Sequence, residues 1–333
     1  MKQKKINWSE LVPLILMIVL FVVLALFSKG KLLKAKAIES ILNQSMGYIV
    51  GALGMLFVMS MGQVDMSMGV NVCVSATVAW LLAGDYGWFP MLIVCCVVGT
   101  LIGAVNGILS AVFDVDTFMI TIAMQIGLRG LINVYFQNSE TGRIVFTKSI
   151  LAFDKVPIKL TILVIFVILV VYLFEFHPFG YRCRAIGENV VCAHESGIDV
   201  KRTKILAFMI AGFFAGLAAL FICCRTGGMT RESGSGFEMR ILLGMFLGGM
   251  PVSGGMDSRV YKLLIGIPGI MIILSGLNMI KGVGTGEFQL IEALILLAIL
   301  LLSRIIKQAM YNKDIVAMAK ALSEDEKRNP GNI

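Results

Sequence analysis

The chain alternates long apolar runs with short polar segments along nearly its whole length. A helix needs roughly 20 apolar residues to cross a bilayer, and every run except the eighth approaches that length. The pattern therefore predicts an all-α polytopic membrane protein with about ten transmembrane helices in a single transmembrane domain, 1–333. The runs cover residues 11–27, 41–61, 66–83, 89–113, 117–136, 158–176, 205–224, 239–250, 260–279 and 288–303.

The main polar interruption is the segment 177–204, which carries five Lys or Arg and three Asp or Glu. Within it, Asn189 is a favourable N-cap, and Gly197 followed by Ile198 is the stop signal of a short helix over 190–196. An isolated helix of two turns is unstable in water. The sequence therefore predicts that this helix forms by docking on another structure.

Basic residues indicate the orientation of the chain. Residues 2–5 are basic and no small-x-small cleavage site follows the first run, so we expect an uncleaved first span with a cytoplasmic N-terminus. Alternation from there places 177–204 and the basic tail in the cytoplasm, as the positive-inside rule requires. If 239–250 only re-entered the membrane, the basic tail would lie outside. Ten spans with both termini cytoplasmic are therefore the better interpretation.

Two groups of basic residues need a separate explanation. The first external loop contains Lys29, Lys31, Lys34 and Lys36. We expect an interfacial helix over 35–45 that holds these lysines at lipid headgroups. The start of the seventh span carries Lys201, Arg202 and Lys204. The helix dipole disfavours each positive charge there by a few tenths to about 1 kcal/mol, so topology or a partner must outweigh that cost.

Composition supports the membrane assignment. Hydrophobic residues make up 58% of the chain and charged residues 15%, against about 25% charged in soluble domains. The net charge of +8 comes largely from basic residues that border apolar runs, which indicates membrane topology and not a nucleic-acid surface. The seven cysteines lie mostly within spans and show no metal-ligand spacing with the two histidines. We interpret them as small core residues and expect no metal and no cofactor.

Two octapeptides suggest an internal repeat. Residues 62–69 (GQVDMSMG) and 248–255 (GGMPVSGG) share Gly, Ser and Gly at the same offsets. Each precedes a glycine-containing span with a late asparagine, Asn106 in the first case and Asn278 in the second. In the ten-span topology both octapeptides face the same side, as a parallel repeat requires. We therefore expect two parallel pseudo-repeats, about 41–136 and 205–303.

The sequence contains no pattern of an enzyme active site. The glycine-rich 248–255 lacks the Gly-Lys-Ser/Thr of a phosphate-binding loop, and no other stretch provides it. Neither His177 nor His194 has a nucleophile or a base at motif spacing. If transport uses ATP, the hydrolysing site must therefore lie on another chain.

Asp65 is the most informative single residue, because an ionised carboxylate costs at least about 2.5 kcal/mol at depth in a bilayer. One interpretation is that Asp65 and Ser67 cap the third span, whose first turn favours a carboxylate. The other is a broken helix that lines a transport pathway, as substrate sites in transporters often are. The two interpretations are compatible, and the sequence leaves both open.

Other polar side chains within or near spans are candidates for the same pathway. Each alone is explained by interhelical hydrogen bonding. As a set they suit a neutral, hydroxyl-rich cargo better than an ion, because a proton- or sodium-coupled carrier needs buried carboxylates or histidines in mid-span. Gln125 and Arg129 also lie one turn apart on one helix face. The candidates are Asn71, Asn106, Gln125, Arg129, Asn133 and Asn278.

Several motifs together resemble the permease subunits of ribose-type (simple-sugar) ABC importers across nearly the whole chain. The segment 62–69 is similar to that family's Gly-x-Ile-Asp-Leu-Ser-Val-Gly. Three further matches are Gly127-Leu-Arg-Gly130, Gly187-Glu-Asn followed by Ser196-Gly-Ile198, and Gly248-Gly followed by Ser253-Gly-Gly255. The chain departs from the family pattern at Met66, Met68, Pro251, Cys192, His194 and Glu195, which leaves the cargo more open than the architecture.

The resemblance implies a multi-pass protein of the bacterial inner membrane that acts with partners. These are cytoplasmic ABC ATPase subunits, an extracytoplasmic sugar-binding protein and a second permease copy, identical or similar. The short helix of 177–204 would then be the coupling helix that contacts the ATPase, with Gly187, Glu188, Asn189, Ala193, Ser196, Gly197 and Ile198 as its characteristic residues. The implied cargo is a monosaccharide. Related permeases carry nucleosides, signalling furanoses or, in a more distant branch, branched-chain amino acids, and a secondary carrier is a further alternative.

Overall fold

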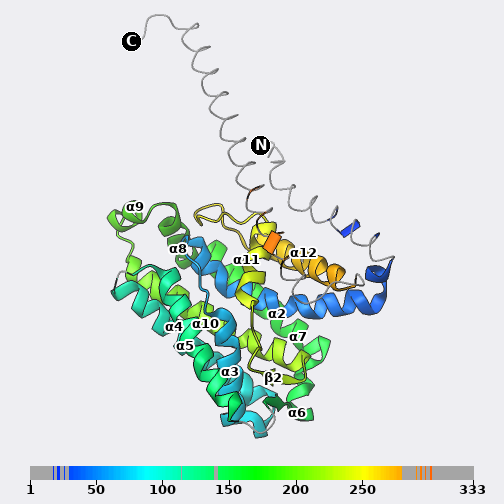
Figure 1. Cartoon of the computed structure of the whole chain (residues 1–333). Coiled ribbons are helices and arrows are strands. Elements are labelled where there is room, and N and C mark those ends of the chain that lie inside the picture. The colour runs from blue at the N-terminus through cyan, green and yellow to red at the C-terminus, as the bar shows by residue number, and fades with distance from the viewer. Residues whose placement is uncertain are drawn as a thin grey trace, which may run out of the picture. The chain divides into compact units, whose positions relative to one another are not determined.

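The structure is a computed structural model that describes residues 30–113, 115–138 and 142–279, with isolated helical positions in 18–26 and 290–301. The chain divides into two compact units, Met1–Lys281 and Gly282–Ile333. All elements discussed below belong to the first unit, and Figure 1 gives their order along the chain.

Long helices dominate the first unit and are joined by short helical turns. The long helices are α2 (Ala35–Ser60), α3 (Met68–Ala83), α4 (Trp88–Val112), α5 (Thr117–Gln137), α7 (Val156–Val171), α10 (Val200–Arg225) and α12 (Val260–Asn278). The shorter helices are α6 (Lys148–Leu151), α8 (Pro178–Glu188), α9 (Val190–Glu195) and α11 (Phe237–Leu247). The 3-10 turns are η1 (Lys31–Leu33), η2 (Gly84–Tyr86) and η3 (Ala152–Asp154), and η4 (Tyr172–Phe176) is a π-helical turn that continues α7.

Seven helices in the described part of the chain are long and apolar enough to cross a membrane. They are α2, α3 with η2, α4, α5, α7 with η4, α10 and α12, and each matches one of the predicted runs. The predicted spans 11–27 and 288–303 lie outside the described residues, apart from isolated positions. The total of ten spans, the pseudo-repeats and the orientation of the termini therefore stay predictions.

A glycine-lined contact between α4 and α10 forms the centre of the helix packing. A Cβ atom at Gly103 would lie 2.2 Å from the Phe208 carbonyl oxygen, and one at Gly212 would lie 2.2 Å from the Gly99 carbonyl oxygen. A Cβ atom at Gly216 would lie 2.1 Å from the Cys95 carbonyl oxygen. The two backbones therefore approach as closely as small residues permit, which is a common way for membrane helices to associate.

The first unit has two distinct ends. At one end, the last turn of α2 meets α8–α9 and the loop before α12, where Gly255 donates its N–H to the Ser60 carbonyl at 2.8 Å. We call this the α9 end. At the other end, β1 (Arg143–Val145) pairs antiparallel with β2 (Gly228–Thr230), so that Arg143 lies opposite Thr230. We call this the β end, and Figure 1 shows α9 and β2 far apart, with α10 running between them.

The predicted eighth run, 239–250, corresponds to a short helix. α11 has 11 residues, which gives a helix about 16 Å long, roughly half the thickness of a bilayer core. The chain nevertheless returns from β2 at the β end to Gly255 at the α9 end, through a non-helical stretch at 231–236 followed by α11. The short run predicted over 239–250 therefore corresponds largely to α11, and the prediction that the chain crosses the membrane at this point stays a prediction.

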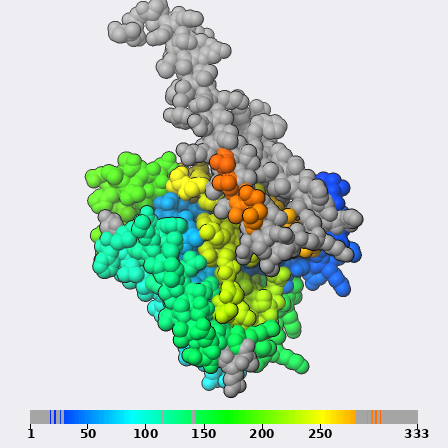
Figure 2. Space-filling view, in the orientation of Figure 1, coloured from blue at the N-terminus to red at the C-terminus, as the bar shows by residue number. Residues whose placement is uncertain are grey.

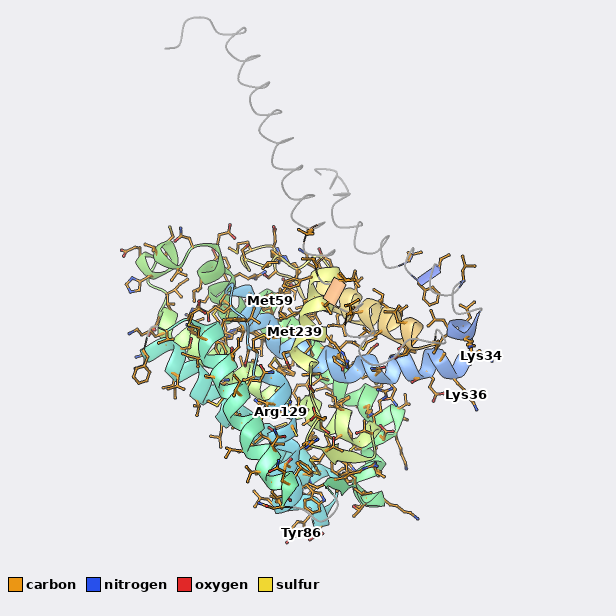
Figure 3. The ribbon with its side chains drawn as sticks, in the orientation of Figure 1. Lys34, Lys36, Met59, Tyr86, Arg129 and Met239 are labelled. Carbon is orange, nitrogen blue, oxygen red and sulfur yellow. The ribbon has the colours of Figure 1, made fainter. Side chains whose placement is uncertain are left out.

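The expected interfacial helix over 35–45 is wrong. These residues are the first turns of α2, which continues without a break to Ser60. The exposed side chains of Lys34 and Lys36 lie at the start of that long helix (Figure 3). The helix continues because the sequence after Ala35 contains no proline or glycine before Gly47.

The two glycine-containing octapeptides of the proposed repeat lie against each other. Gly62 has a φ of 73°, and a Cβ atom there would lie 2.8 Å from the Ser253 carbonyl oxygen. A Cβ atom at Gly254 would lie 2.5 Å from the Gly62 nitrogen. Both octapeptides therefore contribute to the α9 end.

Candidate functional site

The loop between α2 and α3 forms a buried polar network with α4. One carboxylate oxygen of Asp65, Oδ1, accepts the backbone N–H of Ser67 at 2.9 Å and its hydroxyl at 2.7 Å. The Asn106 amide donates to the same hydroxyl at 2.7 Å. All three residues are at most 1% exposed. Three of the predicted pathway residues are therefore in direct contact.

This network differs from the predicted helix cap. Ser67 occupies the N-cap position of α3, but its side chain makes no cap hydrogen bond. Its hydroxyl donates to Asp65 instead, and Asp65 accepts the N–H of the cap residue and not one from the first turn. The interpretation that both side chains cap α3 is therefore wrong. The Ser67 hydroxyl donates to Asp65 and accepts from the Asn106 amide of α4, so it does not bond to the first turn of α3.

The network contains more acceptors than donors. Among the described residues, Asp65 Oδ2 and Asn106 Oδ1 are buried and accept no hydrogen bond from the protein. Burial raises the pKa of the Asp65 carboxyl, although the hydrogen bonds from Ser67 oppose this rise. Because an unsatisfied buried acceptor costs about 1–3 kcal/mol, each atom needs a hydrogen-bond donor that the described residues do not supply.

Gln125 and Arg129 of α5 form a second polar group with the segment around β2 and α11. The Gln125 amide donates to Glu238 Oε1 at 3.1 Å. Arg129 donates to the carbonyls of Arg231 and Ser233, at 2.6 and 3.3 Å. Figure 3 shows Arg129 between the α3–α5 side and the α11 side of the unit. The two side chains therefore face the segment 231–236 and the first turn of α11, and their role in a substrate pathway stays a prediction.

Glu238 is the residue that the sequence analysis missed. It is 3% exposed, and its second oxygen, Oε2, accepts no hydrogen bond from the described residues. This oxygen lies against Gly69 in the first turn of α3, where a Cβ atom would be 2.1 Å away. The signal that could have identified it is a charged residue at the edge of an apolar run, since Glu238 directly precedes the run 239–250.

Two of the predicted pathway residues lie elsewhere. Asn71 joins α3 to α4, because its amide donates to the Gly99 carbonyl at 3.2 Å and its oxygen accepts the Ser75 hydroxyl at 2.8 Å. It therefore has a packing role. Asn278 is exposed at the last residue of α12, a helix that begins at the α9 end, so Asn278 is far from Asp65 along the axis of the unit.

The short helix predicted in 177–204 is present with the predicted signals. Asn189 is the N-cap of α9, and its side-chain oxygen accepts the Cys192 N–H at 3.0 Å. At the other end Gly197 has a φ of 82°, and Ile198 N–H donates to the Ala193 carbonyl at 3.1 Å. The Ser196 hydroxyl adds a bond to the Cys192 carbonyl at 2.7 Å. The local structure is confirmed, and its role as a coupling helix stays a prediction.

Gly187 and Glu188 fix this helix to the rest of the unit. A Cβ atom at Gly187 would lie 2.0 Å from the Ser60 carbonyl oxygen, so the backbones touch there. Glu188 Oε2 accepts the Met256 N–H at 3.1 Å. The base of α9 is thereby attached both to the end of α2 and to the loop before α12.

α9 itself is almost wholly exposed. Of its six residues only Ala193 is buried, while Val190 and Val191 are 51% and 69% exposed. A cavity of about 780 Å³ lies beside it, and its lining includes Val191, Lys204 and Gln63. Exposed apolar side chains on a helix too short to be stable alone indicate a surface that a partner covers.

The structure also explains the basic residues at the start of α10. Asp199 is the N-cap, and its carboxylate accepts the Arg202 N–H at 3.0 Å and forms an ion pair with the Arg202 side chain at 3.0 Å. Lys204 donates to the Ser110 carbonyl at 3.2 Å. A carboxylate at the helix start compensates for the unfavourable dipole, and the sequence analysis did not consider it.

Two charged residues hold the helices together at the unit's ends and were also missed. Glu175 accepts hydrogen bonds from Arg184, from Arg259 at 2.7 Å and from the Val260 N–H at 3.2 Å, which joins η4, α8 and the start of α12. Lys159 of α7 is fully buried and donates to Asp154, Asn43 and the Phe221 carbonyl. Both side chains stand inside or at the edge of apolar runs, which is the signal that could have identified them.

Seven helices of membrane-spanning length, a buried polar network and an exposed short helix at one end suit a multi-pass membrane transport subunit. Residues 37–304 match the family model for the permease component of branched-chain amino acid transport systems. The chain therefore belongs to this family of ABC transporter permeases. It is a multi-pass protein of the inner membrane and a transport component, not an enzyme.

Several curated relatives match the chain at modest identity. The ribose import permease RbsC of Bacillus subtilis is 27% identical over 91% of this chain and 96% of its own length. The fructose import permease FruF of Bifidobacterium longum is 29% identical over 72% and 71%. The D-allose permease AlsC of Escherichia coli is 27% identical over 82% and 85%. No solved structure matches the chain.

Proposed function

We propose that this chain is the membrane-spanning subunit of an ATP-driven importer for a monosaccharide that an extracytoplasmic binding protein delivers. The family membership and the printed functions of the ribose, fructose and allose permeases support a sugar cargo. The observation that carries the proposal is α9, an exposed short helix attached rigidly at its base in a chain without a nucleotide-binding loop. Such a helix suits a subunit whose energy source is another chain.

In this proposal α9 is the coupling helix. ATPase subunits bind its exposed face, which includes Val190 and Val191. A movement of α9 passes to the rest of the unit through Gly187, which touches Ser60, and through the Glu188–Met256 hydrogen bond. A second permease copy, identical or similar, completes the membrane part.

The buried network of Asp65, Ser67 and Asn106 belongs to the substrate pathway in this proposal, together with Gln125, Arg129 and Glu238. Its unsatisfied acceptor oxygens favour a ligand rich in hydroxyl donors. A nucleoside or a signalling furanose has the same hydroxyl chemistry and is the alternative cargo. A secondary carrier is disfavoured, because α9 would then have no partner to contact.

Reconstitution of the full chain into proteoliposomes tests the proposal. With the partner ATPase inside and D-ribose-loaded binding protein outside, we expect uptake that requires ATP. The chain alone should give neither ATP hydrolysis nor uptake under a proton or sodium gradient. D-Allose, D-fructose and adenosine as competitors distinguish a sugar from a nucleoside cargo. Gradient-driven uptake by the lone chain would refute the proposal in favour of a secondary carrier.

A further inference from the structure

The polar residues of α5 follow a strict spacing. Thr117, Thr121, Gln125, Arg129, Asn133 and Gln137 recur every fourth position, and every hydroxyl, amide or charged side chain of the helix except Tyr135 belongs to this set. We call these six residues the polar row. It extends over about 30 Å, the thickness of a bilayer core. The Thr121 hydroxyl bonds within α5 to the Phe118 carbonyl, whereas Thr117, Gln125 and Arg129 make hydrogen bonds outside the helix.

The row changes its surroundings along the helix. A spacing of four residues advances about 40° per step, so the row winds about half a turn around α5. Thr117 and Thr121 are buried, Gln125, Arg129 and Asn133 are half-buried, and Gln137 is exposed. The row is therefore covered by α3 and α4 at the α9 end and becomes open toward the β end. Figure 2 shows α5 uncovered on this face, beside the yellow-green segment that contains β2 and the start of α11.

Contacts connect the buried end of the row to a cavity. The Thr117 hydroxyl lies 2.6 Å from the Ser110 hydroxyl and donates to the Gln63 oxygen at 3.1 Å. Ser110 and Gln63 both line the cavity of about 780 Å³ beside α9. The polar row therefore begins at the wall of that cavity.

The part of the row nearer the β end leads to a second cavity. Gln125 contacts Glu238, and Arg129 donates to the Ser233 carbonyl. Ser233 lines a cavity of about 450 Å³ at the β end, whose walls also carry Asn43, Tyr48 and Arg240. The row thus extends between two cavities at opposite ends of the unit.

We propose that the polar row of α5 lines the route by which a neutral polyhydroxylated substrate passes between these two cavities, with Gln125 and Glu238 at its narrowest point. This inference rests on the proposed transport function and specifies its pathway. Hydroxyl and amide groups exchange hydrogen bonds with sugar hydroxyls without a net charge, and Arg129 disfavours a cation. Repeated similar contacts let a substrate move stepwise without one site that holds it tightly.

Water access along α5 tests the inference without the partner proteins. Single cysteines are introduced at Gln125 and Asn133, in a chain with Cys192→Ser so that the exposed native thiol does not react. The matched controls are Ile126→Cys and Val134→Cys, whose native side chains are 68% and 57% exposed in the isolated chain. The readout is the rate of labelling by a charged, membrane-impermeant thiol reagent in vesicles of both orientations.

We expect the row positions to react roughly tenfold faster or more than their neighbours, because a thiol reacts as the thiolate, which requires water. Lipid or a second copy should cover the neighbours. Equal rates within each pair, or no labelling of the row from either side, would overturn the inference.

A second measurement connects the row to transport. Asn133→Leu removes one half-buried amide at nearly constant volume, and Val134→Leu is the control on the same turn. In the reconstituted importer we expect Asn133→Leu to lower the amount of sugar taken up per ATP several-fold while substrate-stimulated hydrolysis persists. Absence of uptake by the unmodified importer would instead refute the proposed function. Normal uptake by both variants would refute only the role of the row.

Discussion

At the scale of single residues, the end of α9 depends on a glycine backbone. Gly197 has a φ of 82°, yet no atom lies within 4 Å of the position that a Cβ would occupy. Space for a side chain is therefore available, and only the backbone conformation restricts the residue. This conformation directs Ile198 back to the Ala193 carbonyl and closes the helix.

Gly197→Val should therefore uncouple ATP hydrolysis from uptake while the protein still inserts normally. A β-branched residue in the left-handed region costs about 1–2 kcal/mol, comparable to the stability of a two-turn helix end. Gly197→Asn is the control, because asparagine tolerates this conformation, and it should retain most of the coupling. The measurement is uptake per ATP hydrolysed. Wild-type coupling in the valine variant would contradict the argument.

At the scale of elements, close helix packing and polar contacts have separate positions. The glycines of α4 and α10 bring two backbones together without space for a Cβ atom, whereas Gly127 and Gly130 of α5 have no atom within 4 Å of that position. α5 is attached largely through its polar row and contacts with α3 and α4. The polar row is therefore carried by a helix that packs without close backbone contact at its glycines.

Gly103→Ala should destabilise the protein strongly, because its Cβ atom would lie 2.2 Å from the Phe208 carbonyl oxygen. Overpacking of this kind costs about 1–3 kcal/mol or more. The matched control is Gly127→Ala, which meets no neighbouring atom and should be neutral or slightly stabilising, since alanine favours helix over glycine by about 1 kcal/mol. Thermal unfolding in detergent measures both. A similar loss of Tm in the two variants would contradict the argument that the α4–α10 contact leaves no space for a Cβ atom.

At the scale of the whole molecule, the α9 end and the β end must lie on opposite sides of the membrane if α10 crosses it once. Cys192 is an exposed residue of α9. Tyr86 is 77% exposed in η2, and the neighbouring Gly87 lies against Ser149 of α6 at the β end. Figure 3 shows Tyr86 at the edge of the unit remote from α9.

We expect Cys192 to react with an impermeant thiol reagent only in inside-out vesicles. A cysteine at Tyr86, placed in a Cys192→Ser chain, should react only in right-side-out vesicles. This outcome would establish the orientation that the basic residues predict. Labelling of both positions from the same side, or of each from the side opposite to that expected, would refute it.

The sequence by itself determined the features that depend on neighbouring residues. The apolar runs matched seven long helices, and Asn189 and Gly197 marked the ends of α9, because helix length and capping follow from local composition. Only the tertiary structure decided which polar side chains meet. Asn106 reaches Ser67, and Gln125 contacts Glu238 from 113 positions away, while Asn71 and Asn278 have other surroundings. Such contacts depend on how glycine-lined helices pack and on the short, interrupted passage that carries α11. No local pattern contains that information.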